Sequence, residues 1–92
     1  MLSIYPERED KLSPAVYQFA HVMQQKLDAN EHKGLSWTAL TRQEIKARIR
    51  EELVELDKEL AAALTGNSAK VTVEAADIAN FCLFAALLKG KL

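Results

Sequence analysis

The chain has 92 residues, of which 49 % are hydrophobic and 27 % are charged, and its net charge is −1. A chain this short forms one domain, and its core is so small that partner chains are expected to help bury its apolar surface. The apolar content excludes a disordered chain, and the near-zero net charge provides no basic field for nucleic acid or an anionic membrane. We therefore expect a folded protein with neither of these partners.

The cysteine content and the apolar segments predict a cytoplasmic location. Cys82 is the single cysteine, which excludes an internal disulfide and fits a reducing compartment. Residues 1–10 contain no apolar stretch typical of a signal peptide. The most apolar segment, residues 78–88, is shorter than the roughly 20 residues that span a bilayer.

The first predicted helix begins at Ser13 and Pro14. Residues 1–12 are polar and aperiodic, which predicts a flexible N-terminal arm, and residues 13–92 are expected to form one helical domain. Serine caps free amides, and proline at the first helical position loses no needed donor. Apolar residues at three-and-four spacing continue this helix to about His32, and Gly34 is expected to end it.

The second predicted helix begins at about Arg42, after a connection at residues 33–40 that is a candidate for ligand contact. Thr41 and Glu44 form a Thr-x-x-Glu capping box at its start. An apolar stripe then runs for about 23 residues until Gly66 supplies a stop. The stripe consists of Ile45, Ile49, Leu53, Leu56, Leu60 and Leu64.

The third predicted helix runs from about Ser68 to about Lys89 and is capped by Asn67 or Ser68. Residues 71–73 are β-branched and favour a strand, but a lone strand has no pairing partner, so we assign them to the first helical turn. The chain is therefore predicted to be all-α, with a helical hairpin and a third packed helix.

Acidic residues lie on the apolar faces of the second and third helices. A projection at about 100° per residue places Glu52 beside the apolar stripe, and Glu74 and Asp77 within the most apolar face of the third helix. Unpaired buried carboxylates cost several kcal/mol each. No basic residue lies between Lys70 and Lys89. The pair formed by Glu74 and Asp77 therefore needs a metal ion or a distant basic group.

Two acidic pairs on facing helices would gather four carboxylates into one pocket. These are Glu52, Glu55, Glu74 and Asp77. Oxygen ligands suit Mg²⁺, with Mn²⁺ as an alternative, and open coordination positions suit the phosphates of a diphosphate or triphosphate substrate. The two helices carry no histidine, which disfavours a di-iron site. Alternatively, Glu52 and Glu55 form ordinary surface ion pairs with Arg48 or Lys58.

The motif EELVE at residues 51–55 is followed, after eighteen intervening residues, by EAADIANF at residues 74–81. This pattern resembles the signature of the MazG-like all-α NTP pyrophosphatases. The segment KLDANEHKGLSW, residues 26–37, is similar to the connection between the first two helices in short members of that family. Many members carry Glu-Leu-Gly-Asp in the second motif, whereas this chain has Glu74-Ala75-Ala76-Asp77, which retains the acidic positions.

The resemblance implies that the four carboxylates bind Mg²⁺ and that the reaction is hydrolysis of a nucleoside triphosphate to a monophosphate and pyrophosphate, as in nucleotide-pool house-cleaning. Glu52 or Glu55 would be the general base. Lys33 and Asn80 are candidate contacts to phosphate or sugar. Trp37 is expected either to stack on the base or to plug the space between the first two helices.

The resemblance also implies an oligomer. Relatives complete a four-helix unit or pair two subunits around each site, so this three-helix chain is expected to complete a four-helix-bundle-like core as a homodimer or homotetramer. The apolar surface of residues 78–88 is the expected interface. Two alternatives remain open: a non-catalytic helical adaptor whose acidic pairs bridge to a neighbouring chain, and a pyrophosphatase for dUTP, dCTP or phosphoribosyl-ATP.

Overall fold

The computed structural model describes residues 12–30 and 36–90. In these residues it contains three α-helices, one short 3-10 helix and no strand, which confirms the all-α prediction. The elements are α1 (Pro14–Ala29), the 3-10 helix η3 (Ser36–Ala39), α2 (Arg42–Ala63) and α3 (Val71–Leu88). Most of the predicted N-terminal arm lies outside the described residues, as do His32, Lys33 and Gly34.

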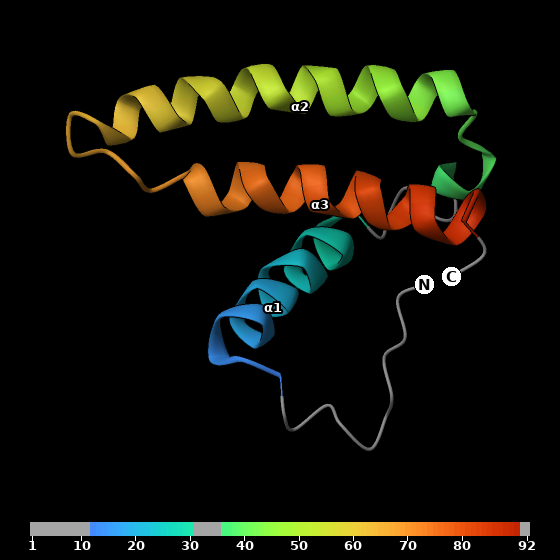
Figure 1. Ribbon diagram of the computed structural model, residues 1–92, viewed down its shortest axis with the longest axis horizontal. Coiled ribbons are helices and arrows are strands. Elements are labelled where there is room, and N and C mark those ends of the chain that lie inside the picture. Colours follow the sequence, from blue (N-terminus) through green and yellow to red (C-terminus); the bar gives the residue numbers. More distant parts are fainter. Residues whose placement is uncertain (1–11, 31–35, 91–92) are drawn as a thin grey trace.

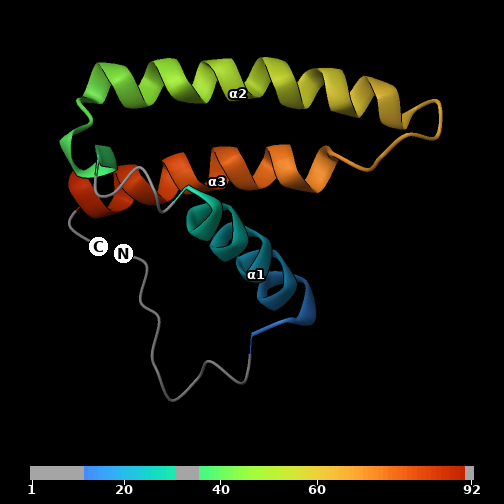
Figure 2. The same cartoon turned by 180° about the vertical axis from the view of Figure 1, so that it is seen from behind.

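Helix α3 is the central element of the fold. Helix α2 runs antiparallel beside it, and α1 lies obliquely on the opposite side of α3 (Figure 1). The same three layers are visible from behind (Figure 2). Helix α3 also contacts η3. A side chain on α3 can therefore face either the α2 layer or the α1 layer, and this arrangement positions the candidate site.

Local hydrogen bonds set the starts of α1 and α2, as the sequence predicts. The Ser13 hydroxyl accepts from the backbone N–H of Val16 at 3.2 Å. At α2, the Thr41 hydroxyl accepts from the Glu44 N–H at 3.1 Å, and the Glu44 carboxylate accepts from the Thr41 N–H at 3.0 Å. Each bond satisfies an amide that the first helical turn leaves free.

The third helix begins later than predicted. It starts at Val71 after Lys70, and no side chain caps it, so the predicted cap at Asn67 or Ser68 is wrong. Residues 67–70 are used in the turn that reverses the chain, where the Val71 N–H donates to the Ser68 carbonyl at 3.2 Å. Gly66 ends the preceding stretch with φ of 96°, a left-handed conformation that glycine adopts without a steric cost.

The described part of the chain buries little apolar surface. Among the described residues, only Ile45, Ala76 and Phe84 are buried hydrophobic residues, and α1 contains no buried residue. Three leucines of the predicted α2 stripe, here named the α2 leucine stripe, are exposed: Leu53 at 50 %, Leu60 at 48 % and Leu64 at 88 %. At about 100° per residue they lie on one line of the helix. Helix α3 thus covers only part of the apolar face of α2.

Helix α3 is long and apolar enough to cross a membrane by length and composition alone. Residues 78–88, which the sequence indicated to be too short to span a bilayer, are only part of this longer apolar helix. Core helices of soluble proteins, which are mostly buried, pass the same test. Glu74 and Asp77 in the first half of α3 would be costly in a bilayer interior. Only 17 % of the helix is buried, which leaves apolar surface available for a further protein chain.

Candidate metal centre

Three carboxylates gather where the middle of α2 faces the first half of α3. Glu52, Glu74 and Asp77 each have an oxygen within 4.8 Å of the others, and all three side chains are half-buried. Glu74 and Asp77 are three residues apart, so they point to the same side of α3. The antiparallel packing of the two helices therefore brings together three of the four predicted ligands.

The fourth predicted ligand, Glu55, lies outside this group. Its carboxylate is 3.3 Å from the ammonium of Lys58, and its side chain is 50 % exposed. The alternative of a surface ion pair thus describes Glu55, whereas none of the ion pairs found in the described residues involves Glu52. An exposed pair of this kind is worth about 0–1 kcal/mol, so Lys58 does not hold Glu55 firmly in place.

Full ionisation of the three carboxylates is unfavourable because their negative charges lie close together. Burial, followed by the charges of Asp77 and Glu74, raises the pKa of Glu52 above its ordinary value. A bound cation removes this repulsion, and a set of carboxylate oxygens at this spacing matches the ligand chemistry of Mg²⁺. The residues present therefore fit a divalent metal ion.

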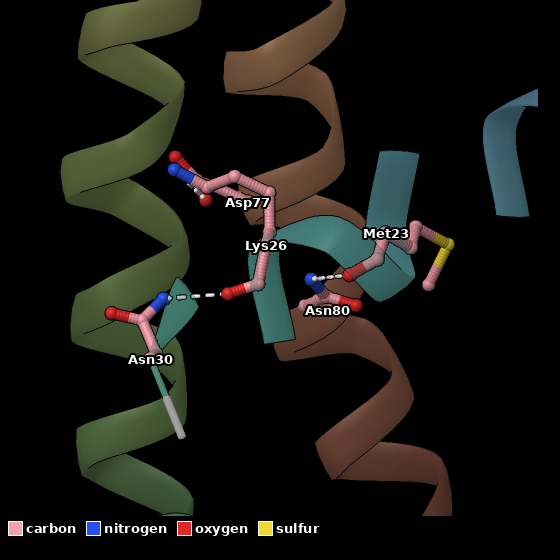
Figure 3. A network of polar contacts seen from close by, with 5 residues as sticks. All are labelled: Met23, Lys26, Asn30, Asp77 and Asn80. Atoms are coloured by element: carbon pink, nitrogen blue, oxygen red, sulfur yellow. Dashed lines mark hydrogen bonds and ion pairs between the residues drawn. The ribbon is translucent and has the colours of Figure 1, made fainter. Parts of the chain in front are cut away.

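Asp77 also has a basic partner, which the sequence reasoning did not identify. The ammonium of Lys26 on α1 lies 3.2 Å from its carboxylate (Figure 3). The sequence required a metal or a distant basic group for the second acidic pair, and the structure supplies such a group for Asp77. The position of Lys26 could have indicated this contact. Lys26 lies three residues after Met23 and one before Leu27, which places it on the half-buried face of α1.

Asn80 connects α3 to α1 one turn after Asp77. Its side chain is buried, with 6 % exposed, and its Nδ2 donates to the backbone carbonyl of Met23 at 3.1 Å (Figure 3). Its Oδ1 is buried without a hydrogen-bond partner. The observed role of Asn80 is thus to hold the two helices together, and its contact with a nucleotide remains a prediction.

Trp37 packs against α3 through η3. Its indole stacks on Phe84 with ring centroids 4.8 Å apart and an interplanar angle of 14°, and Phe84 in turn meets Phe81 edge to face at 5.7 Å. Trp37 therefore packs on α3, and not between the first two helices as one of the two sequence predictions placed it. Phe84 covers one face of the indole, and stacking of a base on Trp37 remains a prediction.

Comparison with known proteins identifies the family of this chain. A family model described as phosphoribosyl-ATP pyrophosphohydrolase matches residues 16–90, a range that includes all four predicted carboxylates. No curated protein and no solved structure matched the chain. The matched range covers most of the chain and contains nearly all of α1, together with η3, the helical hairpin and the carboxylate group. The chain therefore belongs to the phosphoribosyl-ATP pyrophosphohydrolase family, a family of hydrolases acting on phosphoric anhydrides within the MazG-like all-α NTP pyrophosphatase superfamily.

Proposed function

We propose that this protein is a Mg²⁺-dependent nucleoside triphosphate pyrophosphohydrolase that converts a ribo- or deoxyribonucleoside triphosphate to the monophosphate and pyrophosphate. One observation carries the proposal: Glu52, Glu74 and Asp77 form a half-buried carboxylate group in a chain of a pyrophosphohydrolase family. Such a group is costly without a cation. Family membership disfavours the non-catalytic adaptor.

The three grouped carboxylates would supply oxygen ligands for the metal ion. Glu55 lies one turn from Glu52 and would join them by leaving its exposed pair with Lys58. When bound, Mg²⁺, or Mn²⁺ in its place, would neutralise phosphate charge and polarise the α,β anhydride bond. The chain itself supplies the positions of these ligands on two packed helices.

The attacking water needs a carboxylate that orients it and accepts its proton. Glu52 is the better placed of the two candidates, because it lies inside the carboxylate group, whereas Glu55 is outside it. Parallel assays of Glu52→Gln and Glu55→Gln distinguish the two assignments, since loss of the base lowers kcat more than it weakens binding.

Phosphoribosyl-ATP is a second candidate substrate, favoured by the description of the matching family model. It contains the same triphosphate and would release pyrophosphate from the same bond. The carboxylate group therefore serves either substrate, and groups that contact the base and sugar select between them. Trp37 and Asn80 are the candidates for such contacts among the described residues.

We also propose that the active protein is a homo-oligomer. The described residues bury only three hydrophobic side chains, while the α2 leucine stripe is open to solvent. A second copy of the chain would cover this stripe and add helices to the three-helix unit. Of the large hydrophobic side chains in residues 78–88, only Leu87 is exposed by the same measure, at 39 %. We therefore place the main contact on α2, with the apolar surface of α3 adding to it. We propose a soluble, cytoplasmic enzyme.

A substrate panel with Mg²⁺ tests this function. Pyrophosphate release is followed with ribo- and deoxyribonucleoside triphosphates, including dUTP and dCTP, and with phosphoribosyl-ATP. We expect release by the wild type and at least about a hundredfold loss of kcat/KM in Glu74→Gln, a loss of about 2.7 kcal/mol of transition-state stabilisation. Glu51→Gln is the matched control, because Glu51 is exposed and paired with Arg48 at 3.5 Å. Absence of pyrophosphate from every substrate, or full activity of Glu74→Gln, would refute the proposal.

A further inference from the structure

The ion pair between Lys26 and Asp77 joins α1 to a member of the carboxylate group. Their side chains are 30 % and 21 % exposed, so the pair is less solvated than the other two ion pairs found in the described residues. Those two pairs each lie within α2 and involve Glu51 and Glu55, neither of which belongs to the group. Among the described residues, Lys26 is therefore the cation that pairs directly with a member of this group, Asp77.

The turn of α1 that carries Lys26 is held on both sides by asparagine amides (Figure 3). Asn80 binds the Met23 carbonyl at 3.1 Å, and Asn30 donates from its side chain to the carbonyl of Lys26 itself at 2.9 Å. Met23 precedes Lys26 by three residues, and Asp77 precedes Asn80 by three, so the two contacts between α1 and α3 lie one turn apart on both helices. These contacts position the ammonium beside Asp77 while leaving its flexible side chain free to move.

One ammonium cannot balance three carboxylates, and its positive charge opposes a metal ion bound by the same oxygens. A lysine side chain is a compact charge on a flexible stem, and it binds phosphate oxygens well. When a metal ion takes over the neutralisation of Asp77, the ammonium of Lys26 becomes available for another anion, such as a phosphate.

We propose that Lys26 is a substrate-binding residue of this site: its ammonium pairs with Asp77 in the metal-free protein, and moves to the phosphate chain of the substrate once the carboxylates hold a divalent cation. This inference rests on the proposed metal site and triphosphate substrate. It assigns α1 a part in the site, although the four motif carboxylates all lie on α2 and α3.

If Lys26 moves in this way, its replacement should change the affinities for Mg²⁺ and for tripolyphosphate in opposite directions. A lysine that only connects two helices would not have this effect. Lys26→Met removes the competing cation, so Mg²⁺ alone should bind roughly threefold to tenfold more tightly. Inorganic tripolyphosphate in the presence of Mg²⁺ should bind about tenfold more weakly. Both affinities are measured by isothermal titration calorimetry on the full chain. Lys26→Arg retains the charge and should keep both affinities within about threefold of the wild type.

Lys89→Met is the matched control. Lys89 is exposed at the end of α3, twelve residues and about 18 Å along the helix from Asp77. It loses the same charge, and both affinities should stay unchanged. Equal or weaker Mg²⁺ binding by Lys26→Met would overturn the exchange, and unchanged tripolyphosphate binding would overturn the phosphate contact.

A measurement on the wild type keeps the test independent of whether Lys26→Met folds. The side-chain resonance of Lys26, assigned by its loss in Lys26→Arg, should shift when Mg²⁺ is added and again when tripolyphosphate follows, whereas that of Lys89 should not. A resonance that responds to neither addition refutes the inference. The binding and resonance measurements do not require turnover. An inactive wild type would therefore count against the proposed function alone. An active wild type whose Lys26 resonance does not shift would count against this inference alone.

Discussion

The side-chain amide of Asn80 and the backbone carbonyl of Met23 form a 3.1 Å hydrogen bond between α3 and α1, one turn from the Lys26–Asp77 ion pair (Figure 3). Helix α1 contains no buried residue of its own. These two polar contacts therefore add to the partly buried apolar packing of α1 on α3, and they lie beside the candidate metal centre.

Replacement of Asn80 should destabilise the protein through this contact. Asn80→Ala loses a buried hydrogen bond and some packing, at a cost of about 1–2 kcal/mol in the free energy of unfolding. Asn80→Asp should cost more, because a carboxylate would face the Met23 carbonyl without a donor. Urea unfolding of the full chain measures both. Asn30→Ala is the comparison, since Asn30 also donates to an α1 carbonyl but is exposed, and an equal cost for Asn30→Ala and Asn80→Ala would contradict the importance of burial.

Neutralisation of Glu52 should stabilise the metal-free protein while removing stabilisation by Mg²⁺. Its raised pKa means that this residue contributes stability below the ordinary carboxyl pKa, and that the contribution is lost as the pH rises through the raised pKa. At pH 7 without metal, Glu52→Gln should therefore melt roughly 1–3 °C higher than the wild type. Added Mg²⁺ should raise the melting temperature of the wild type more than that of the variant.

Thermal melts with a chelator and with Mg²⁺ measure these differences. Glu51→Gln removes the same charge from the solvated side of α2 and should leave the response to Mg²⁺ intact. A lower melting temperature for metal-free Glu52→Gln would show that Glu52 makes a favourable contact that outweighs the repulsion.

The capping box of α2 should make stability depend on pH at the acid end. The hydrogen bonds from Thr41 lower the pKa of Glu44. Its contribution is therefore fully present above the ordinary carboxyl pKa and is lost as the pH falls through the lowered value. Glu44→Gln should flatten this part of the curve of melting temperature against pH, and Thr41→Val should cost about 1 kcal/mol at neutral pH by removing the cap. If the melting temperature of Glu44→Gln falls with acid as steeply as that of the wild type, other carboxylates cause the acid destabilisation.

The α2 leucine stripe should be needed for self-association. Leu60→Glu places a charge at the middle of the stripe and should shift the protein to a smaller species at micromolar concentration. Sedimentation velocity gives the size directly. Val54→Glu is the control on the same helix, because Val54 is similarly exposed at 56 % but lies about 100° away from the stripe. A wild type that sediments as a monomer, or equal effects of the two substitutions, would refute the proposed interface.

Much of the fold was predictable because it depends on short-range interactions. The Ser13 cap and the Thr41–Glu44 capping box act within one helical turn, and they place the starts of α1 and α2 where the sequence indicates. The start of α3 was predicted too early, because the sequence Asn67-Ser68 is equally suited to a cap and to a turn. The need to reverse the chain against α2 decides between the two.

The carboxylate site was predictable in part for the same reason. The three-residue spacing of Glu74 and Asp77 on one helix determines that they point together, and their place in an apolar segment indicates that they need a cation. The sequence also indicated that Glu52 would face them, which the structure confirms. By itself, then, the sequence determined the presence of the three helices and three members of the acidic group, Glu52, Glu74 and Asp77.

Only the tertiary structure decided which side chains from distant segments meet. Lys26 reaches Asp77 from fifty-one positions away, Trp37 stacks on Phe84, and Glu55 turns to Lys58 instead of joining the other three carboxylates. Helical periodicity specifies directions around one axis, but not which face of a neighbouring helix lies opposite. The packing of α1 and α2 on opposite sides of α3 settles that question, and with it the charge balance of the candidate metal centre.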